Sequence, residues 1–378
     1  MTDTSARPEG LSAYIAVTAA YWAFMLTDGA LRMLVLLHFH SLGFSPVQLA
    51  YLFVLYEIAG MVTNISAGWI ATRFGLTSML YAGLGIQVLA LLTLAQLDPN
   101  WTVGLSVALL TGSKNAVKGL GFLLGAALLA TLGFVWAVVG MAAILTVILI
   151  AVLVVMPPGL PKGRKGAKFS EVFSKSANIN WLSAARVFLF GARDVWFVVG
   201  IPIYFYAVLS DGTVSGNRTA FFMIGTFMAV WVILYGFVQA SAPRILRAST
   251  RAENDLVHAA KGWSWALASI PAVLTVAALL SGGPQPWLSV ILVAGLLAFG
   301  ALFAINSALH SYLILAFTKS ERVTMDVGFY YMANAGGRLL GTLLSGATYQ
   351  MGGLPLMLAT ATAMVCIAAF LAGRLAPS

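Results

Sequence analysis

Apolar runs long enough to cross a lipid bilayer recur along almost the whole chain. A transmembrane helix needs about 20 consecutive apolar residues. In the first part of the sequence such runs lie at about 11–38, 47–70, 78–96 and 133–156, with a compressed apolar region at 101–131. In the second part they lie at about 182–209, 219–240, 262–281, 287–315, 323–348 and 354–374. Because helices satisfy their own backbone hydrogen bonds in lipid, we predict an all-α membrane protein.

Composition excludes the soluble classes of protein. Of 378 residues, 60% are hydrophobic and 9% are charged, whereas soluble domains carry about 25% charged residues. The single Cys366 excludes an internal disulfide and a multi-thiolate metal site, because each needs at least two thiols. The sequence contains no Walker motif, nucleophile motif or His-rich metal set. We therefore expect neither an enzyme nor a cofactor.

Basic residues gather in alternate loops. They are Arg73 after the second run; Lys162, Arg164, Lys165, Lys168 and Lys175; Arg244, Arg247, Arg251 and Lys261; Lys319 and Arg322; and Arg374. Lys and Arg accumulate in cytoplasmic loops of membrane proteins. This pattern predicts a bacterial inner (plasma) membrane protein with both termini in the cytoplasm. It also explains the net charge of +9 without a nucleic-acid partner.

The basic segment 157–181 divides the chain. We predict an N-terminal transmembrane bundle at 1–156, a cytoplasmic linker at 157–181 and a C-terminal bundle at 182–378. Six spans fit the second bundle, but the first is shorter by about one span and its loop. Two six-span halves joined by a basic loop predict the major facilitator superfamily fold, with about eleven spans here against twelve expected. The shortfall lies near residue 107, and either the protein has eleven spans or the chain carries a deletion.

One loop supports this fold. Gly68-Trp-Ile-Ala-Thr-Arg73-Phe-Gly75 resembles the superfamily's Gly-x-x-x-Asp-Arg-x-Gly signature, with Thr72 at the acidic position. The glycines permit close helix approach, and Arg73 can neutralise helix C-terminal carbonyls. We therefore assign Gly68, Arg73 and Gly75 to a conformational loop.

A closer resemblance covers most of the chain. The stretches at 21–40, 56–64, 110–119, 173–180 and 182–204, which include LTDGALRMLVLLHFH and RVFLFGARDVWFVVGIPIY, resemble the ArsJ family of organoarsenical efflux permeases. The resemblance implies export of 1-arseno-3-phosphoglycerate, arsenate resistance, and a functional link to a glyceraldehyde-3-phosphate dehydrogenase that uses arsenate in place of phosphate. Family members carry an additional stretch near residue 107 that includes the rest of the fourth span.

Ionisable residues inside the spans are costly and mark candidate sites. Asp28 and Arg32 share one face of the first span, either as a self-neutralising pair or as a cavity-facing pair. Glu57, in the second span, is a candidate for proton coupling or a partner for Arg32 or a lysine. Lys114 and Lys118 either face the cavity or mark the cytoplasmic end of a shortened helix.

The second bundle carries the other candidates. Arg186, Arg193 and Asp194 lie in the seventh span, and Asn334 and Arg338 lie near the middle of the eleventh. Arginine forks bind tetrahedral oxyanions through paired charge-assisted hydrogen bonds. We predict that the arginines, Lys114, Lys118 and Asn334 bind substrate, while Asp28, Glu57 and Asp194 serve in proton coupling or ion pairs. The alternative is that each arginine is tied to an aspartate or a backbone carbonyl.

Together these features predict a monomeric secondary permease that moves a small anionic substrate across a lipid bilayer by alternating access. A general drug or organic-anion/proton antiporter is the alternative transport function. A truncated, inactive family member is a further alternative, and a membrane enzyme or receptor would need a catalytic cluster or soluble domain that the sequence lacks.

Overall fold

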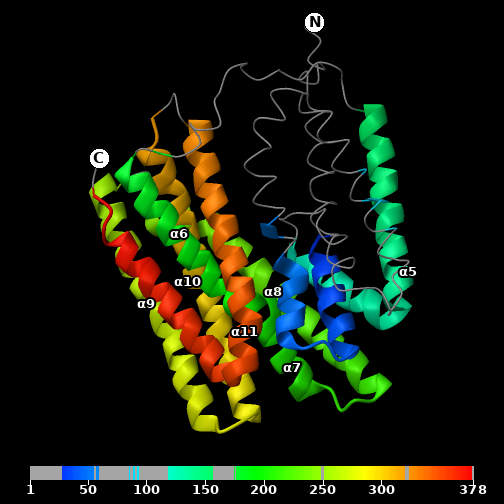
Figure 1. Cartoon of the computed structure of the whole chain (residues 1–378). Coiled ribbons are helices and arrows are strands. Elements are labelled where there is room, and N and C mark those ends of the chain that lie inside the picture. Colours follow the sequence, from blue (N-terminus) through cyan, green and yellow to red (C-terminus); the bar gives the residue numbers. More distant parts are fainter. Residues whose placement is uncertain are drawn as a thin grey trace, which may run out of the picture.

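The computed structural model is an assembly of long, roughly parallel helices (Figure 1). It describes residues 28–54, 57–58, 85, 88–89, 92, 118–155, 174, 176–247, 251–319 and 323–376. Residues 28–41 and 46–54 are helical. The elements that follow are α5 (Lys118–Val155), α6 (Ala177–Val195), the π-helix η3 (Trp196–Gly200), α7 (Ile201–Leu209), α8 (Val214–Leu246), α9 (Glu253–Ser281), α10 (Pro286–Phe317) and α11 (Val323–Ala372). No strand occurs among these residues.

Helices lie over all six spans expected in the second half of the chain. Within the described residues, six helices are long and apolar enough to cross a membrane. One of them, α11, is interrupted by non-helical backbone at Gly352 and Gly353, where the chain reverses direction (Figure 1). Gly353 has a φ of 61°, a left-handed conformation that glycine adopts without steric cost. The prediction of separate spans before and after this turn agrees with the structure.

A second glycine bends α5. Gly133 has a φ of 75° and separates a short first segment from a long second one. Arg218, at the start of α8, donates from Nε to the Ala130 carbonyl at 2.7 Å, which satisfies one free carbonyl at the end of the first segment. The second segment begins where the sequence predicted a span at 133–156.

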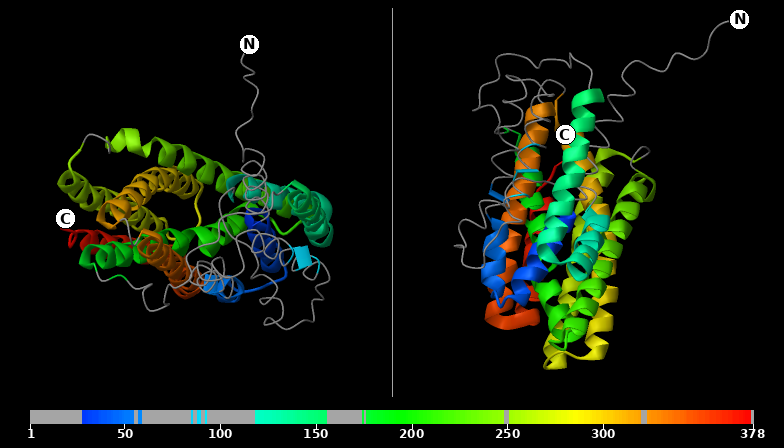
Figure 2. Two further views of the ribbon diagram at one scale, coloured as in Figure 1. Left: turned by 90° about the horizontal axis from the view of Figure 1, so that it is seen from above. Right: turned by 90° about the vertical axis from the view of Figure 1, so that its right-hand side faces the viewer.

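The continuous element α6–η3–α7 lies at the centre of the molecule. It is mostly buried, whereas α5, α8 and α9 expose many large apolar side chains, such as Val154, Phe237 and Leu280. Seen from above, the green α6–η3–α7 element runs from beside the red end of α11 towards the blue helix of the first half (Figure 2). Exposed apolar side chains suit a lipid-facing surface, so the polar groups on the central element need partners inside the protein.

Candidate functional site

Cationic and aromatic side chains follow one face of the central element. Arg186, Phe190, Arg193 and Phe197 are three or four residues apart, which places them one above the other along a helix. The guanidinium carbon of Arg186 lies 4.0 Å from the Phe190 ring centroid, and that of Arg193 lies 5.0 Å from it. Such contacts contribute about 2 kcal/mol when desolvated. Aromatic rings thus hold both arginines along the face.

Buried charges from both halves of the chain form one network. Glu57 Oε1 accepts from Arg32 Nη2 at 2.7 Å and from Arg338 Nη2 at 2.6 Å. Arg32 also lies 3.8 Å from Asp28, and Arg338 Nε lies 3.3 Å from Asp194 Oδ2. The Glu57 side chain is fully buried. This carboxylate therefore ties the first half of the chain to α11 of the second.

Arg193 completes the network at its other end. Its Nε donates to Asp194 Oδ1 at 2.6 Å. Its side chain is 14% exposed, more than that of any other member. Among the described residues the network holds three arginines and three carboxylates, whose formal charges cancel. Buried charges persist when they are paired in this way.

Glycines set the distance between α6 and α11. A Cβ on Gly337 would overlap the backbone of Val187, and a Cβ on Gly341 would overlap the backbone of Gly191. Two glycines four residues apart form the small-xxx-small pattern that brings membrane helices close together. This close approach lets Arg338 of α11 reach Asp194 of α6.

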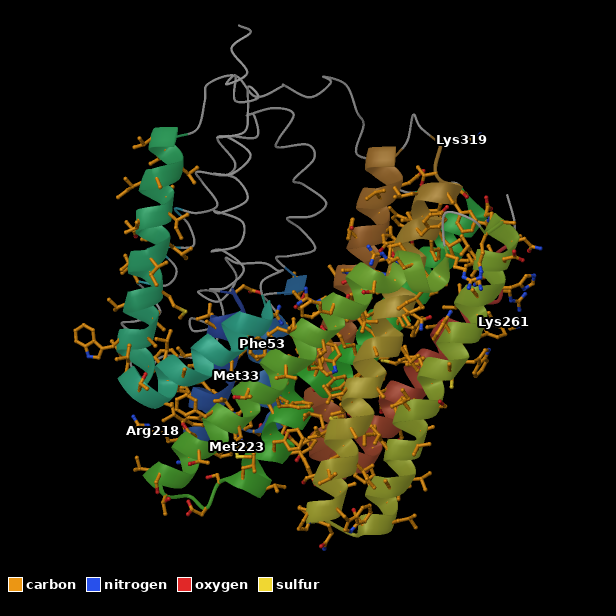
Figure 3. The ribbon with its side chains drawn as sticks, turned by 180° about the vertical axis from the view of Figure 1, so that it is seen from behind. Met33, Phe53, Arg218, Met223, Lys261 and Lys319 are labelled. Atoms are coloured by element: carbon orange, nitrogen blue, oxygen red, sulfur yellow. The ribbon has the colours of Figure 1, made fainter. Side chains whose placement is uncertain are left out.

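A cavity of about 260 Å³ opens beside the network. Met33 and Phe53, which line it from the first half, lie close together where the helices of the two halves meet (Figure 3). Its lining residues are Arg32, Met33, Leu36, Phe53, Phe190, Arg193, Asp194, Phe197, Val198, Met228, Trp231, Val232, Tyr235, Gln239, Asn334 and Arg338. The cavity therefore has charged groups and a large aromatic surface.

Trp231 and Tyr235 of α8 form much of that aromatic surface. The Trp231 indole donates to the Leu296 carbonyl at 2.7 Å, and its ring stacks on Tyr235 with centroids 5.6 Å apart. Gly300 packs beneath the indole, where any side chain would collide with it. The hydrogen bond fixes the ring orientation, so this surface is preorganised for an apolar or planar group.

The π-helix η3 shapes the same region. Pro202 cannot donate a backbone hydrogen bond, which disrupts the regular helix just before it. Ser345 Oγ of α11 accepts from the backbone amides of Val199 at 3.3 Å and Gly200 at 3.1 Å. Single π-turns inside α-helices occur frequently at functional sites. Here the turn follows directly after Arg193 and Asp194.

The structure brings most of the predicted site residues together. Arg32, Arg193, Asp194, Asn334 and Arg338 line the cavity. Asp28 and Glu57 join them through ion pairs, as the ion-pair interpretation expected.

Other predicted residues lie elsewhere. Arg186 is not part of the charge network. Gly68, Arg73, Gly75 and Lys114 fall outside the described residues, as does the side chain of Lys118. Their assigned functions, and those of the cavity residues, stay predictions.

Sequence reasoning missed the contribution of α8. Met228, Trp231, Tyr235 and Gln239 all line the cavity and are three or four residues apart. That spacing was a usable signal, because it places a stripe of polarisable and polar side chains on one helix face.

Three solved transporter structures resemble the chain over nearly its whole length. A mutant of the nucleoside transporter NupG has a TM-score of 0.69 and 15% identity, covering 97% of this chain and 98% of that one. A bacterial homologue of the iron transporter ferroportin, in an inward-facing state, has a TM-score of 0.63 and 12% identity, covering 96% and 99%. The E. coli fucose:proton symporter FucP has a TM-score of 0.61 and 11% identity, covering 97% and 99%.

These likenesses confirm the predicted fold: the described residues form helices and no strand, and the chain shares the fold of these transporters. Identities this low establish the fold alone. The sequence matches no protein-family model and no curated protein.

Proposed function

We propose that the protein is a secondary transporter that moves a small organic anion across a membrane by alternating access. The observation that carries this proposal is the cavity between the two halves, which is lined by Arg32 from one half and by Arg193 and Arg338 from the other. A charged cavity at the junction of two helical bundles is where such transporters bind their substrates. Ionisable side chains at membrane depth usually face such a cavity or one another.

Arg193 is the best candidate to contact the substrate first. Arg32 and Arg338 each contact two carboxylates, whereas Arg193 is paired with Asp194 and its side chain is the most exposed of the network. A tetrahedral oxyanion can replace Asp194 on Arg193 and receive a bidentate pair of hydrogen bonds. Asp194 would keep its contact with Arg338, so the network would remain largely intact.

The substrate we propose is 1-arseno-3-phosphoglycerate, which the ArsJ resemblance implies. This ester carries two tetrahedral oxyanion groups, and guanidinium forks match both. Its export would confer arsenate resistance in cells where a glyceraldehyde-3-phosphate dehydrogenase forms it. Because each of the three arginines contacts a carboxylate, an anionic group of the substrate must compete with that carboxylate for its arginine.

A general organic-anion or drug/proton antiporter is the second candidate. The aromatic surface of Phe197, Trp231 and Tyr235 favours it, because an aliphatic ester does not need stacked rings. A substrate with a planar or apolar part would use both sides of the cavity.

Transport into everted vesicles separates these candidates. Vesicles from cells expressing the chain would receive arsenate, with or without glyceraldehyde-3-phosphate, the dehydrogenase and its nicotinamide cofactor. Uptake of arsenic that requires the complete dehydrogenase system is the expected result. Uptake of arsenate alone would contradict the ester. A second chain with a restored fourth span tests the alternative of a truncated, inactive protein, since that alternative requires uptake only by the restored chain.

Replacing Arg193 by lysine tests the proposed contact. Lysine keeps the charge but cannot form the bidentate pair, so we expect about tenfold weaker transport, equivalent to about 1.4 kcal/mol. Arg244→Lys is the matched control, because Arg244 is exposed at the end of α8. Equal uptake by both variants would remove Arg193 from the substrate site.

A further inference from the structure

Arg186 differs from the three arginines of the charge network. It is 4% exposed, yet no carboxylate oxygen among the described residues lies within 4.0 Å of its guanidinium. Its Nη1 donates to the backbone carbonyl of Ser307 at 3.0 Å. A carbonyl offers a dipole and no compensating charge. An uncompensated cation is expensive inside a protein, and more so at membrane depth.

Further polar atoms near Arg186 are buried without hydrogen-bond partners. They are Arg186 Nε, both ring nitrogens of His310, and the hydroxyls of Ser183 and Ser307. His310 is fully buried. More than about 90% of buried polar groups in proteins are hydrogen-bonded to protein or water, so a concentration of unsatisfied atoms indicates an unseen ligand.

Three helices bring these groups together. Ser183 and Arg186 are three residues apart on α6, and Ser307 and His310 are three apart on α10, so each pair shares a helix face. The Arg186–Ser307 hydrogen bond joins the two faces. From α11, the Tyr330 ring centroid lies 4.7 Å from the Arg186 guanidinium carbon. The charge of Arg186 also acts on the His310 imidazole.

We propose that Arg186, Ser183, Ser307 and His310 form a buried binding site for a small inorganic anion, separate from the central cavity. Each of these side chains can donate a hydrogen bond, and the group carries one net positive charge. Water would satisfy the donors but would leave the charge of Arg186 uncompensated. Chloride or a small oxyanion such as phosphate supplies both the acceptor atoms and the negative charge.

The position of this site separates it from transport of the substrate. Arg186 precedes Arg193 by seven residues, which is about 10 Å along a helix, and the Phe190 ring contacts both guanidiniums. The bound anion would hold α6, α10 and α11 together, whatever molecule occupies the cavity.

Anion-dependent stability of the purified full-length protein tests the site. Thermal unfolding would be followed in detergent at constant ionic strength, with chloride, phosphate or sulfate replacing gluconate. We expect a saturable rise in Tm of at least about 3 °C with at least one of the three. No rise with any of them would overturn the proposal and leave water as the ligand.

Two variants assign the effect to this site. Arg186→Gln should abolish the rise, while the exposed control Arg244→Gln should retain it, because general salt effects act on both variants alike. An equal rise in both would overturn the proposal. If Arg186→Gln does not fold, the same titration would be made with His310→Leu. We expect the anion concentration at half-saturation to rise about tenfold. An unchanged concentration would exclude the site.

Discussion

At the residue scale, the protein handles membrane-buried charge by pairing it. Arg32 and Arg338 come from opposite halves of the chain and share one oxygen of Glu57. Within its own helix Arg32 has the longer contact with Asp28, at 3.8 Å, so Glu57 is its closer described carboxylate. The fully buried Glu57 is thus the central carboxylate of the network, and its removal should disturb both halves.

Replacing Glu57 by glutamine should destabilise the protein by about 3–5 kcal/mol, because two buried guanidiniums then share one carboxylate fewer. Thermal unfolding in detergent measures the effect. The double variant Glu57→Gln/Arg338→Gln restores neutrality and should recover part of the loss. A double variant as unstable as the sum of the two single variants would show that the two residues are not coupled.

At the element scale, the site depends on how closely α6 and α11 approach. Gly337 and Gly341 allow backbone contact at the level of Arg193, Asp194 and Arg338. The hydroxyl of Ser345, one turn further along α11, accepts hydrogen bonds from two backbone amides of η3, those of Val199 and Gly200. Helix α11 therefore provides space, charge and hydrogen bonding to the same part of the central element.

Gly341→Ala should destabilise the protein by about 1–3 kcal/mol, because the new methyl group would overlap the backbone of Gly191. Gly328→Ala, on the same helix, is the control, since its Cβ would meet open space. That variant should be neutral or stabilising by up to about 1 kcal/mol from helix propensity. Similar unfolding temperatures for the two variants would show that helix contact at Gly341 is not tight.

At the scale of the whole molecule, the halves meet at one end through small contacts. A Cβ on Gly346 of α11 would overlap the backbone of Pro46 and the side chain of Ala50. The Val47 amide donates to Gln350 Oε1 at 3.3 Å. Also between the halves, Arg218 binds the Ala130 carbonyl.

Gly346→Leu should shift the protein away from this closed arrangement, because leucine cannot fit against the 46–54 helix. Spin labels at the exposed positions Leu42 and Met351, in a Cys366→Ser background, would report the change by electron–electron distance measurement. We expect longer distances in Gly346→Leu and an unchanged distribution in Gly328→Leu. Identical distributions in both would show that Gly346 does not limit closure.

Much of the fold was predictable because lipid imposes a simple rule on sequence. Spans must be long, apolar and helical, so their ranges in the second half agree with α6–α7, α8, α9, α10 and both parts of α11. Lys319, in the loop after α10, lies at one end of the molecule, and Arg218, in the first turns of α8, lies toward the other (Figure 3). The orientation in the membrane stays a prediction.

The candidate site was predictable only as a set of residues. Asp28, Arg32, Glu57, Arg193 and Arg338 were found because buried charge is costly in any membrane helix. The Arg32–Glu57 pair was among the alternatives that the sequence offered. The Glu57–Arg338 pair was not, because these residues are 281 positions apart and meet only when the halves pack. His310 gave no signal, since a lone histidine in an apolar run is unremarkable until its surroundings are known.

The sequence by itself predicted long apolar helices of a membrane protein, and helices lie over the six spans expected in the second half, because hydrophobic length and charge placement are local properties. Only the tertiary structure decided which charges cancel, because ion pairing depends on distances between helices far apart in the chain. It paired Arg32, Arg193 and Arg338 with carboxylates and placed Arg186 among uncharged donors. The sequence marked Arg186 as a buried cation, but only the packing of α6 against α10 shows which groups surround it.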